Sequence, residues 1–260
     1  MPVVEQIKEI LKKFEPISLK EMDTVELMNR TDSKYIFNIK KLPEILEESK
    51  NNFKVLEISQ ERLFSYTTTY YDTTDYSLFA NHMLGKMNRH KIRQRTYEST
   101  GVTYLEVKFK TNKNRTIKWR IKNEVNGGFN QIATDFLMNY TKLESAKLNA
   151  VVTNRFKRIT LVSIEDKTRI TLDFDISFTG INKIFEELPF LAIAEIKREG
   201  YHSNDKFINL LKQRGIRQAG FSKYCVGSAL LFDIPRKNVL KPKFLQLKRI
   251  KNEYDLNNLS

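Results

Sequence analysis

The chain has 260 residues, of which 29% are charged and 40% hydrophobic, a balance that is typical of a folded domain and excludes a disordered chain. Its formal net charge of +14 indicates an anionic partner, such as nucleic acid, an acidic lipid surface or a phosphate-rich ligand. The single cysteine excludes an internal disulfide, and the lack of any run of about 18 apolar residues predicts that no helix crosses a membrane.

The first half of the chain predicts an alternation of helices and strands. Residues 3–14 have the pattern of an amphipathic helix rather than of a secretion signal, so we expect a cytoplasmic protein. Ser18 and Glu21 have the spacing of a helix capping box. The elements that follow are a strand at 29–40, a helix at 41–50, an aromatic and threonine-rich strand at 63–73, a helix at 74–87 that Gly85 could end, and three strands up to residue 124.

The second half predicts a hairpin, a further strand and helices. A turn at 126–128 precedes a helical segment that extends to residue 149. The next predicted elements are a hairpin of strands 151–162 and 168–178, a strand at 189–200, and helices at 203–214 and 222–233. Without a linker or a repeat, we expect one domain over residues 1–235, and a basic tail at 236–260 that is loosely patterned and weakly docked.

Charged residues alternate with apolar ones in many of these strands. The strands with a charged residue at every second position include residues 30–34, 91–95, 106–110, 118–122 and 169–175, with a shorter case at 195–197. Alternation with a period of two places the charged and the apolar side chains on opposite faces of a sheet. The apolar face must be covered, most simply by the predicted helices.

The charged face has two interpretations. For any single strand, a row of charges that faces water is the simplest one. Six such strands could instead curl until their charged faces meet, and a barrel of about eight strands is just wide enough to hold a small ligand. Two like charges 4 Å apart cost about 4 kcal/mol at an effective dielectric constant of about 20, so an enclosed basic face would need a polyanion inside it.

Acidic residues recur in the same rows, and they too have two interpretations. These residues are Asp32, Glu106, Asp173, Asp175 and Glu195. They could form ordinary ion pairs with the neighbouring arginines and lysines, or they could bind Mg²⁺ or Mn²⁺ together with phosphate oxygens. A surface that binds the nucleic-acid backbone would have little use for them, so we expect no nucleic acid.

Seven segments in this order resemble the VTC domain, the polyphosphate-polymerase branch of the triphosphate tunnel metalloenzymes, which are related to the CYTH domains. The segments are "RTDSKY", "YYDT", "KIRQRTY", "LEVKFK", "RITLDFDI", "AIAEIK" and "FSKY", within about residues 20–232. The resemblance implies an α+β fold, with an antiparallel eight-stranded β-barrel that forms a tunnel and helices packed on its outside. It also implies that Mn²⁺ or Mg²⁺ assists transfer of the terminal phosphate of ATP to inorganic polyphosphate.

Carried over residue by residue, the resemblance predicts the site. It implies catalytic roles for the basic residues Lys34, Arg93, Arg95, Lys108, Arg155, Arg169 and Lys197. Substrate-binding candidates are Lys91, Lys118 and Arg120 in the charged rows, and Ser222 and Lys223 of the "SK" motif. Glu195 matches the metal-binding glutamate of the family, and Glu106 and Asp173 are further metal candidates. The sequence departs from the family pattern at Thr153, where a tyrosine is usual, and at Gly220, where a lysine is missing nearby.

Phosphate chemistry agrees with these residue types. Arginine offers paired donors to phosphate oxygens, lysine acts as a movable point charge, and phosphoryl transfer needs mainly positioning and charge stabilisation. Ser222 at the start of a predicted helix, together with free backbone N–H groups, would make an anion site to which Lys223 adds.

Other constellations are weak. No P-loop motif occurs, and the three histidines, His82, His90 and His202, lack metal-ligand spacing, so packing roles are expected for them. Cys225 is expected to be a buried helix residue, and Asp72 to cap a turn. The basic tail is most simply a solvated charge run, although it could contact anionic lipid or a product chain.

The leading hypothesis is an ATP:polyphosphate phosphotransferase, and three alternatives stay open. The same fold could hydrolyse tripolyphosphate or nucleoside triphosphates, a plugged tunnel favouring hydrolysis and an open one polymerisation. The chain could also bind polyphosphate without catalysis. RNA binding is disfavoured because Phe109, Trp119 and Phe174 fall on the face opposite the charges. The sequence leaves open the metal, the product length, the oligomeric state and whether a membrane protein receives the chain.

Overall fold

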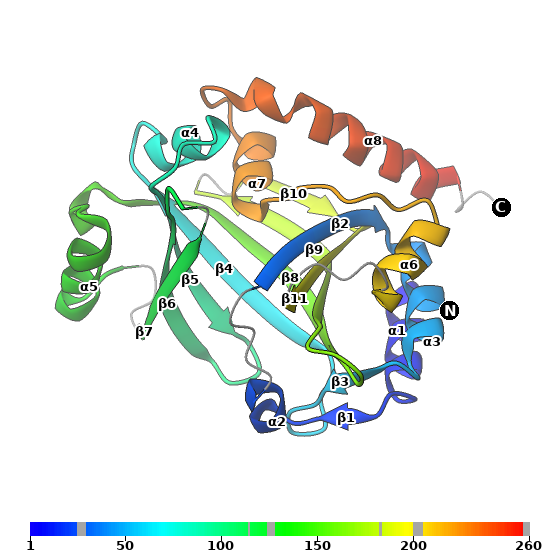
Figure 1. Cartoon of the computed structure of the whole chain (residues 1–260). Helices are drawn as coiled ribbons and strands as arrows, with labels where there is room; N and C mark the ends of the chain where they lie inside the picture. Colours follow the sequence, from blue (N-terminus) through cyan, green and yellow to red (C-terminus); the bar gives the residue numbers. More distant parts are fainter. Residues whose placement is uncertain (25–29, 114, 124–127, 182–183, 200–204, 257–260) are drawn as a thin grey trace.

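The computed structural model describes residues 1–24, 30–113, 115–123, 128–181, 184–199 and 205–256, and a large sheet forms its centre (Figure 1). The strands are β1 (Pro16–Ile17), β2 (Arg30–Asn38), β3 (Phe53–Leu56), β4 (Phe64–Asp72), β5 (Arg89–Tyr97), β6 (Val102–Lys110), β7 (Thr116–Lys122), β8 (Asn149–Ser163), β9 (Arg169–Gly180), β10 (Phe185–Leu188) and β11 (Leu191–Glu199). They form an 11-stranded sheet, whose main path runs β2-β11-β9-β8-β4-β5-β6-β7.

All neighbours along this main path are antiparallel, which confirms the predicted antiparallel eight-stranded architecture. The sheet is not sealed into a barrel, because no pairing joins the edge strands β2 and β7 among the described residues. The chain around Ala219 lies along the edge of β2 instead, and the Ala219 N–H donates to the Lys34 carbonyl at 2.7 Å.

The helices are α1 (Val3–Leu11), α2 (Leu19–Thr24), α3 (Leu42–Ser49), α4 (Ser77–Met83), α5 (Gln131–Thr141), α6 (Lys206–Gln213), α7 (Lys223–Leu231) and α8 (Lys241–Leu256). The capping box that precedes α2 is confirmed, since the Ser18 hydroxyl accepts from the Glu21 N–H at 3.3 Å and the Ser18 N–H donates to the Glu21 carboxylate at 2.9 Å. In the described part of the chain, no helix has both the length and the apolar character needed to cross a membrane.

Several elements differ from the expectation. The strands β1, β3 and β10 were not predicted, because segments of two to four residues are too short to show a period. The basic tail contains a regular helix, α8, which buries Leu247 and Ile250 against the body of the protein. The predicted turn at 126–127, the start of a helix at 203 and His202 lie outside the described residues.

Two apolar clusters cover the outer face of the sheet, as expected for outside helices. In the first, α1, α3 and α6 pack on β2, β11, β9 and β8, with Phe37, Phe174 and Phe207 buried together. In the second, α5 packs on β5 and β6, with Val107 and Leu137 fully buried. Figure 1 shows these helices on opposite flanks of the curved sheet. The outer face is therefore dry where these two clusters cover it, which leaves the charged side chains of the same strands on the inner face.

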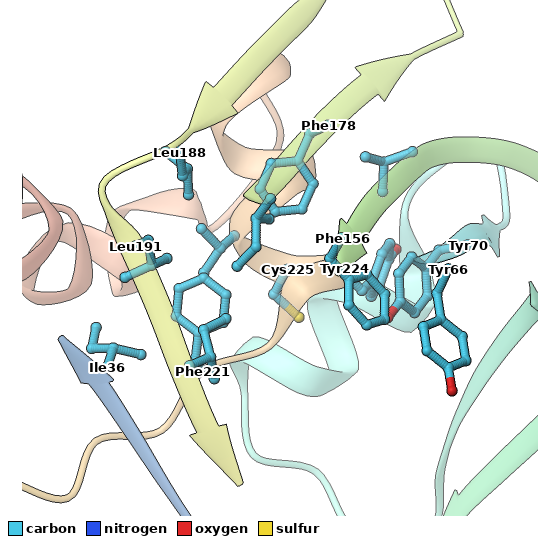
Figure 2. Packing of buried hydrophobic residues seen from close by; sticks show 14 of the residues in the cluster. Ile36, Tyr66, Tyr70, Phe156, Phe178, Leu188, Leu191, Phe221, Tyr224 and Cys225 are labelled. Atoms are coloured by element: carbon cyan, nitrogen blue, oxygen red, sulfur yellow. The ribbon is translucent and has the colours of Figure 1, made fainter. Parts of the chain in front are cut away.

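The helix α7 packs on the inner face instead. Its residues Tyr224 and Cys225 lie against inner-face side chains from several strands, among them Tyr70, Phe156 and Phe178 (Figure 2). The approach is close: a Cβ atom added at Gly227 would lie 2.4 Å from the Phe178 ring. An apolar cluster around α7 thus occupies one part of the inner face, and the charged residues occupy the rest.

A charged inner face as the candidate active site

Strand register places one set of predicted site residues together on β5, β6 and β7. Directly paired residues in an antiparallel sheet share a face. Arg93 on β5 pairs with Glu106 on β6, and Glu106 pairs with Arg120 on β7. Two residues further along β6, Lys108 pairs with Lys91 on β5 and with Lys118 on β7, and all three lie on this same face of the sheet.

A second set lies on β2, β11, β9 and β8. Lys34 on β2 pairs with Glu195 on β11, and Lys197 on β11 pairs with Arg169 on β9. Asp173, on the same side of β9, pairs with Arg158 on β8. Asp32 also belongs to this face, opposite Lys197.

The two sets face each other across the curved sheet. The pKa of Lys108 lies well below the ordinary lysine value, because of Arg93 first and burial second; Glu195 opposes this shift and Lys197 adds to it. Four strands separate β6 from β11 along the sheet, so Lys108 and Glu195 could not interact if the sheet were flat. The charged rows therefore converge on a shared interior.

Each of the three carboxylates predicted as metal ligands lies between two cations. Glu106 lies 2.6 Å from Arg93 and 2.5 Å from Lys118. Asp173 accepts from Arg158 at 2.5 and 2.8 Å and also from Lys223, and Glu195 lies 2.7 Å from Lys34 and 3.6 Å from Lys197. Burial alone would raise these carboxyl pKa values, but the adjacent cations bring all three below the ordinary range, so the groups stay ionised.

Basic residues outnumber carboxylates on this face, and several have no ion-paired carboxylate among the described residues. Arg95 donates to the Thr68 hydroxyl at 3.2 Å and lies over the ring of Phe156, and Lys91 contacts the His82 ring and the Ser222 hydroxyl. Burial, with Arg93 and Arg158, lowers the pKa of Arg95 to about 10. Such side chains repel one another when the interior holds no anion, and a polyanion would neutralise them.

The first turn of α7 borders this interior. The Ser222 hydroxyl accepts from the Cys225 N–H at 3.3 Å, which makes Ser222 the N-cap that the sequence predicted. Lys91 donates to the same hydroxyl at 3.3 Å. Lys223 extends to Asp173 and lies 4.1 Å from the centre of the Phe156 ring, and burial lowers its pKa to about 8. Both residues of the "SK" motif thus lie where an anion could meet the helix N-terminus.

The predicted inner-face position of Arg155 is wrong. Arg155 pairs with Thr67 on β4 and Ser177 on β9, is exposed, and lies on the outer face of β8. The inner position belongs to Arg158, which the sequence reasoning missed. With Arg158 in this role, an aromatic residue, Phe156, stands two positions before the arginine, which reduces the departure noted at Thr153 to a phenylalanine in place of a tyrosine. The alternation of Arg158 with the outward Ile159 was the signal that could have identified it.

Asp175 also leaves the predicted row. A register shift between β8 and β9 accompanies a φ of +54° at Asp175, as at a β-bulge. Its carboxylate is half exposed and pairs with Lys157 at 2.7 Å, away from the inner face. The extra residue shifts the alternation by one position, so that beyond it Ile176 and Phe178 face α7 on the inner side.

The remaining predicted residues differ in their surroundings. Arg120 is exposed on the edge strand β7, with its guanidinium 4.9 Å from the centre of the Tyr104 ring. Arg169 and Lys197 are half-buried. Besides Arg158, the sequence did not predict Asn154 on the inner face: it is fully buried opposite Thr68, and neither its Oδ1 nor its Nδ2 atom has a hydrogen-bond partner among the described residues. A buried polar group without hydrogen-bond partners lowers the stability of the fold, unless a ligand supplies the partners.

Residues assigned packing roles behave as expected where they are described. Asp72 accepts from the N–H groups of Leu78 and Phe79 at 2.9 and 2.8 Å, which confirms that it caps a turn. Cys225 is buried, and burial raises its thiol pKa. His82 is half-buried beside Lys91 and Arg89, and burial first, then these two cations, lower its pKa to about 3 and keep the ring neutral.

A divalent metal fits this site only in one manner. Among the described residues, no group of three or more histidine, cysteine, aspartate or glutamate side chains is arranged to hold a metal. Of the three carboxylates predicted as metal ligands, Glu195 is the most accessible, with 21% of its side chain exposed, compared with 0% for Glu106 and 5% for Asp173. One carboxylate together with substrate phosphate oxygens is a common way to hold Mg²⁺, and Glu195 fits it.

Comparisons with known proteins agree with this geometry. The model of the VTC domain family matches residues 29–232. Among curated protein sequences, none matches this chain. A Hippeastrum protein, described as a candidate adenylyl cyclase with a dominant triphosphatase activity, is 12% identical; the match covers 81% of this chain and 99% of that one, with a TM-score of 0.50. At this identity, the likeness shows a shared fold.

Two bacterial candidate adenylate cyclases are also similar in structure. The one from Bacillus halodurans is 12% identical over 75% of this chain and 96% of that chain, with a TM-score of 0.49. The one from Vibrio parahaemolyticus is 14% identical over 76% of this chain and 99% of that chain, with a TM-score of 0.47.

Proposed function

The chain belongs to the VTC domain family, and from this premise and its inner-face charges we propose that it is a metal-dependent phosphotransferase that moves the terminal phosphate of ATP onto a polyphosphate chain. The observation that carries the proposal is the convergence of cationic rows from β5–β6 and β2–β11 on one interior, seen in the Lys108–Glu195 interaction. An interior with this excess of positive charge favours a ligand that carries a negative charge on every unit, as polyphosphate does.

The side chains have distinct expected roles. Arg93 and Arg95 on β5 and Arg158 on β8, the two strands that flank β4, present planar donors to phosphate oxygens, and the ion pairs to Glu106 and Asp173 fix the orientation of Arg93 and Arg158. Lys34, Lys108 and Lys197 add point charges around Glu195. Since phosphoryl transfer depends mainly on positioning and charge stabilisation, these groups are sufficient without a covalent nucleophile.

Glu195 is the residue expected to hold Mn²⁺ or Mg²⁺. When bound, the metal would supply charge neutralisation at the phosphate oxygens. Lys34 and Lys197 flank Glu195, so they would meet the same phosphate group from either side.

A second candidate, hydrolysis of tripolyphosphate or a nucleoside triphosphate, is favoured by one observation. The apolar cluster around α7 fills part of the inner face, with Tyr70, Phe156 and Tyr224 packed together (Figure 2). A growing chain must leave through an open end, whereas a short substrate needs only one entrance. The hydrolase would differ only in using water in place of the acceptor chain.

One experiment separates the alternatives. Purified full-length protein is incubated with ATP and Mn²⁺ or Mg²⁺, and the products are resolved by gel and by phosphorus NMR. Long-chain polyphosphate with ADP is the expected result and supports the phosphotransferase. Free phosphate without polyphosphate chains would contradict the phosphotransferase and support the hydrolase. No turnover, with tight polyphosphate binding, would leave only a binding module.

A further inference from the structure

The helix α8 lies beyond the region that matches the VTC domain family. That region ends at residue 232, and α8 extends from Lys241 to Leu256 along the periphery of the protein (Figure 1). One side of the helix packs on β2 and β11 and buries Leu247 and Ile250. Near its end, Lys41 pairs with Glu253 at 2.9 Å and Lys40 donates to the Tyr254 carbonyl at 3.2 Å. The helix is thus fixed on the body with a defined outward side.

The outward side combines basic and apolar residues. Helical spacing places six exposed positions on one stripe, namely Lys241, Leu245, Lys248, Arg249, Asn252 and Leu256. Leu245 is 62% exposed and Leu256 is 67% exposed. The one exposed acidic residue of α8, Asp255, lies at the edge of this stripe near the end of the helix, and none of the three cations of the stripe has an ion pair among the described residues. We call this set the α8 outer stripe.

The composition of the stripe selects among partners. A polyphosphate chain would engage the cations but would give no use to two exposed leucines. A second copy of this chain, meeting the same stripe, would bring like charges together. An anionic lipid surface uses both features, because lysine and arginine contact the head groups while leucine enters the interfacial layer.

We propose that the α8 outer stripe docks the protein on an anionic lipid surface, with the helix lying parallel to the membrane plane. The stripe is separate from the inner face, so this docking is independent of the reaction proposed above. Each lysine or arginine near such a surface contributes about 1 kcal/mol, or roughly a fivefold gain in affinity, so three cations give salt-sensitive and reversible binding.

The test is co-sedimentation of the full-length protein with vesicles. Vesicles of phosphatidylcholine alone are compared with vesicles that contain phosphatidylglycerol, at low and at high salt. Binding only to the anionic vesicles, lost at high salt, is the expected result. The triple variant Lys241→Glu, Lys248→Glu, Arg249→Glu is expected to bind at least about tenfold more weakly. The double variant Leu245→Ser, Leu256→Ser is expected to weaken binding too, which charge alone would not explain.

A matched control separates the stripe from the overall charge. The variant Lys20→Glu, Lys142→Glu, Lys212→Glu makes the same change in net charge at exposed positions on α2, at the end of α5 and on α6, and it should bind vesicles as the parent does. Equal loss of binding in both triple variants would overturn the proposal. A parent protein that does not bind anionic vesicles would also overturn it, even if α8 were then found to contact polyphosphate or an acidic protein surface.

Discussion

Arg155 and Arg158 lie on opposite faces of β8: Arg158 donates to Asp173 at 2.5 and 2.8 Å on the inner face, and Arg155 pairs across the outer face with Thr67 and Ser177. The two arginines form a matched pair for mutagenesis. We expect Arg158→Lys to lower kcat/KM for ATP by about tenfold or more, because lysine cannot donate to Asp173 and to phosphate in the same planar geometry. Arg155→Lys should change it less than about twofold. Steady-state kinetics measures both, and a comparable loss in Arg155→Lys would contradict the assignment.

Glu195→Gln should separate binding from turnover. The substitution removes the negative charge between Lys34 and Lys197, so the affinity for tripolyphosphate should stay the same or increase. Turnover with Mn²⁺ should fall by about a hundredfold, because the residue expected to hold the metal is lost. Calorimetry and kinetics give the two quantities. The control is Glu187→Gln, an exposed position on β10, and a parallel loss of affinity in Glu195→Gln would argue against a metal role.

The affinity for polyphosphate should fall as the pH rises above 8. Burial lowers the pKa of Lys91 to about 8, and an adjacent phosphate would raise it, so binding takes up a proton. The contribution of Lys91 is therefore complete below pH 8 and is lost progressively above it, by up to about tenfold per pH unit until the pKa of the bound state is reached. In Lys91→Met, the decrease of polyphosphate affinity with pH should be less steep, because about one proton fewer is taken up on binding. In Lys91→Arg, this pH dependence should also become less steep, but the affinity itself should be retained. Titrations between pH 7.5 and 9.5 test this, and an unchanged slope in Lys91→Met would exclude Lys91 as the source.

Gly227→Ala should destabilise the protein although alanine is the better helix former. The added Cβ atom would lie 2.4 Å from the Phe178 ring, and overpacking of this kind costs about 1–3 kcal/mol. An exposed helix position would instead gain up to about 1 kcal/mol from the same change. Urea unfolding gives the sign. Gly220→Ala is the control, because nothing lies within 4 Å of a Cβ atom there; stabilisation of Gly227→Ala would mean that α7 packs less closely.

Asn154→Leu should stabilise the fold and weaken substrate binding. The side chain of Asn154 is buried, and neither of its polar atoms has a hydrogen-bond partner within the described parts of the chain, so an apolar residue of the same branching removes an unfavourable contribution of about 1–2 kcal/mol. A phosphate chain that uses the amide would lose these hydrogen bonds. Thermal unfolding and tripolyphosphate titration report the two effects, with the exposed Asn139→Leu on α5 as a control. Lower stability together with unchanged affinity would show that the amide serves the fold alone.

Much of the architecture was predictable because it rests on local periodicity. The alternation in β5, β6, β7, β11 and the first half of β9 follows from the two-residue repeat of an extended chain, and it correctly separated Arg93 and Lys108 from Val107 and Phe174. The helix cap at Ser222 and the turn at Asp72 depend on hydrogen bonds within a few residues, so they too were correct.

The sequence alone therefore determined that, in most of the charged strands, basic and acidic residues share one face of an antiparallel sheet and apolar residues occupy the other. Only the tertiary structure decided which residues meet in the interior. The bulge at Asp175, the choice of Arg158 over Arg155 and the packing of α7 against Tyr70 and Phe178 all depend on pairing between distant strands. Local propensity cannot specify such pairing, because the register and twist that bring Lys108 toward Glu195 arise from contacts among segments far apart in the chain.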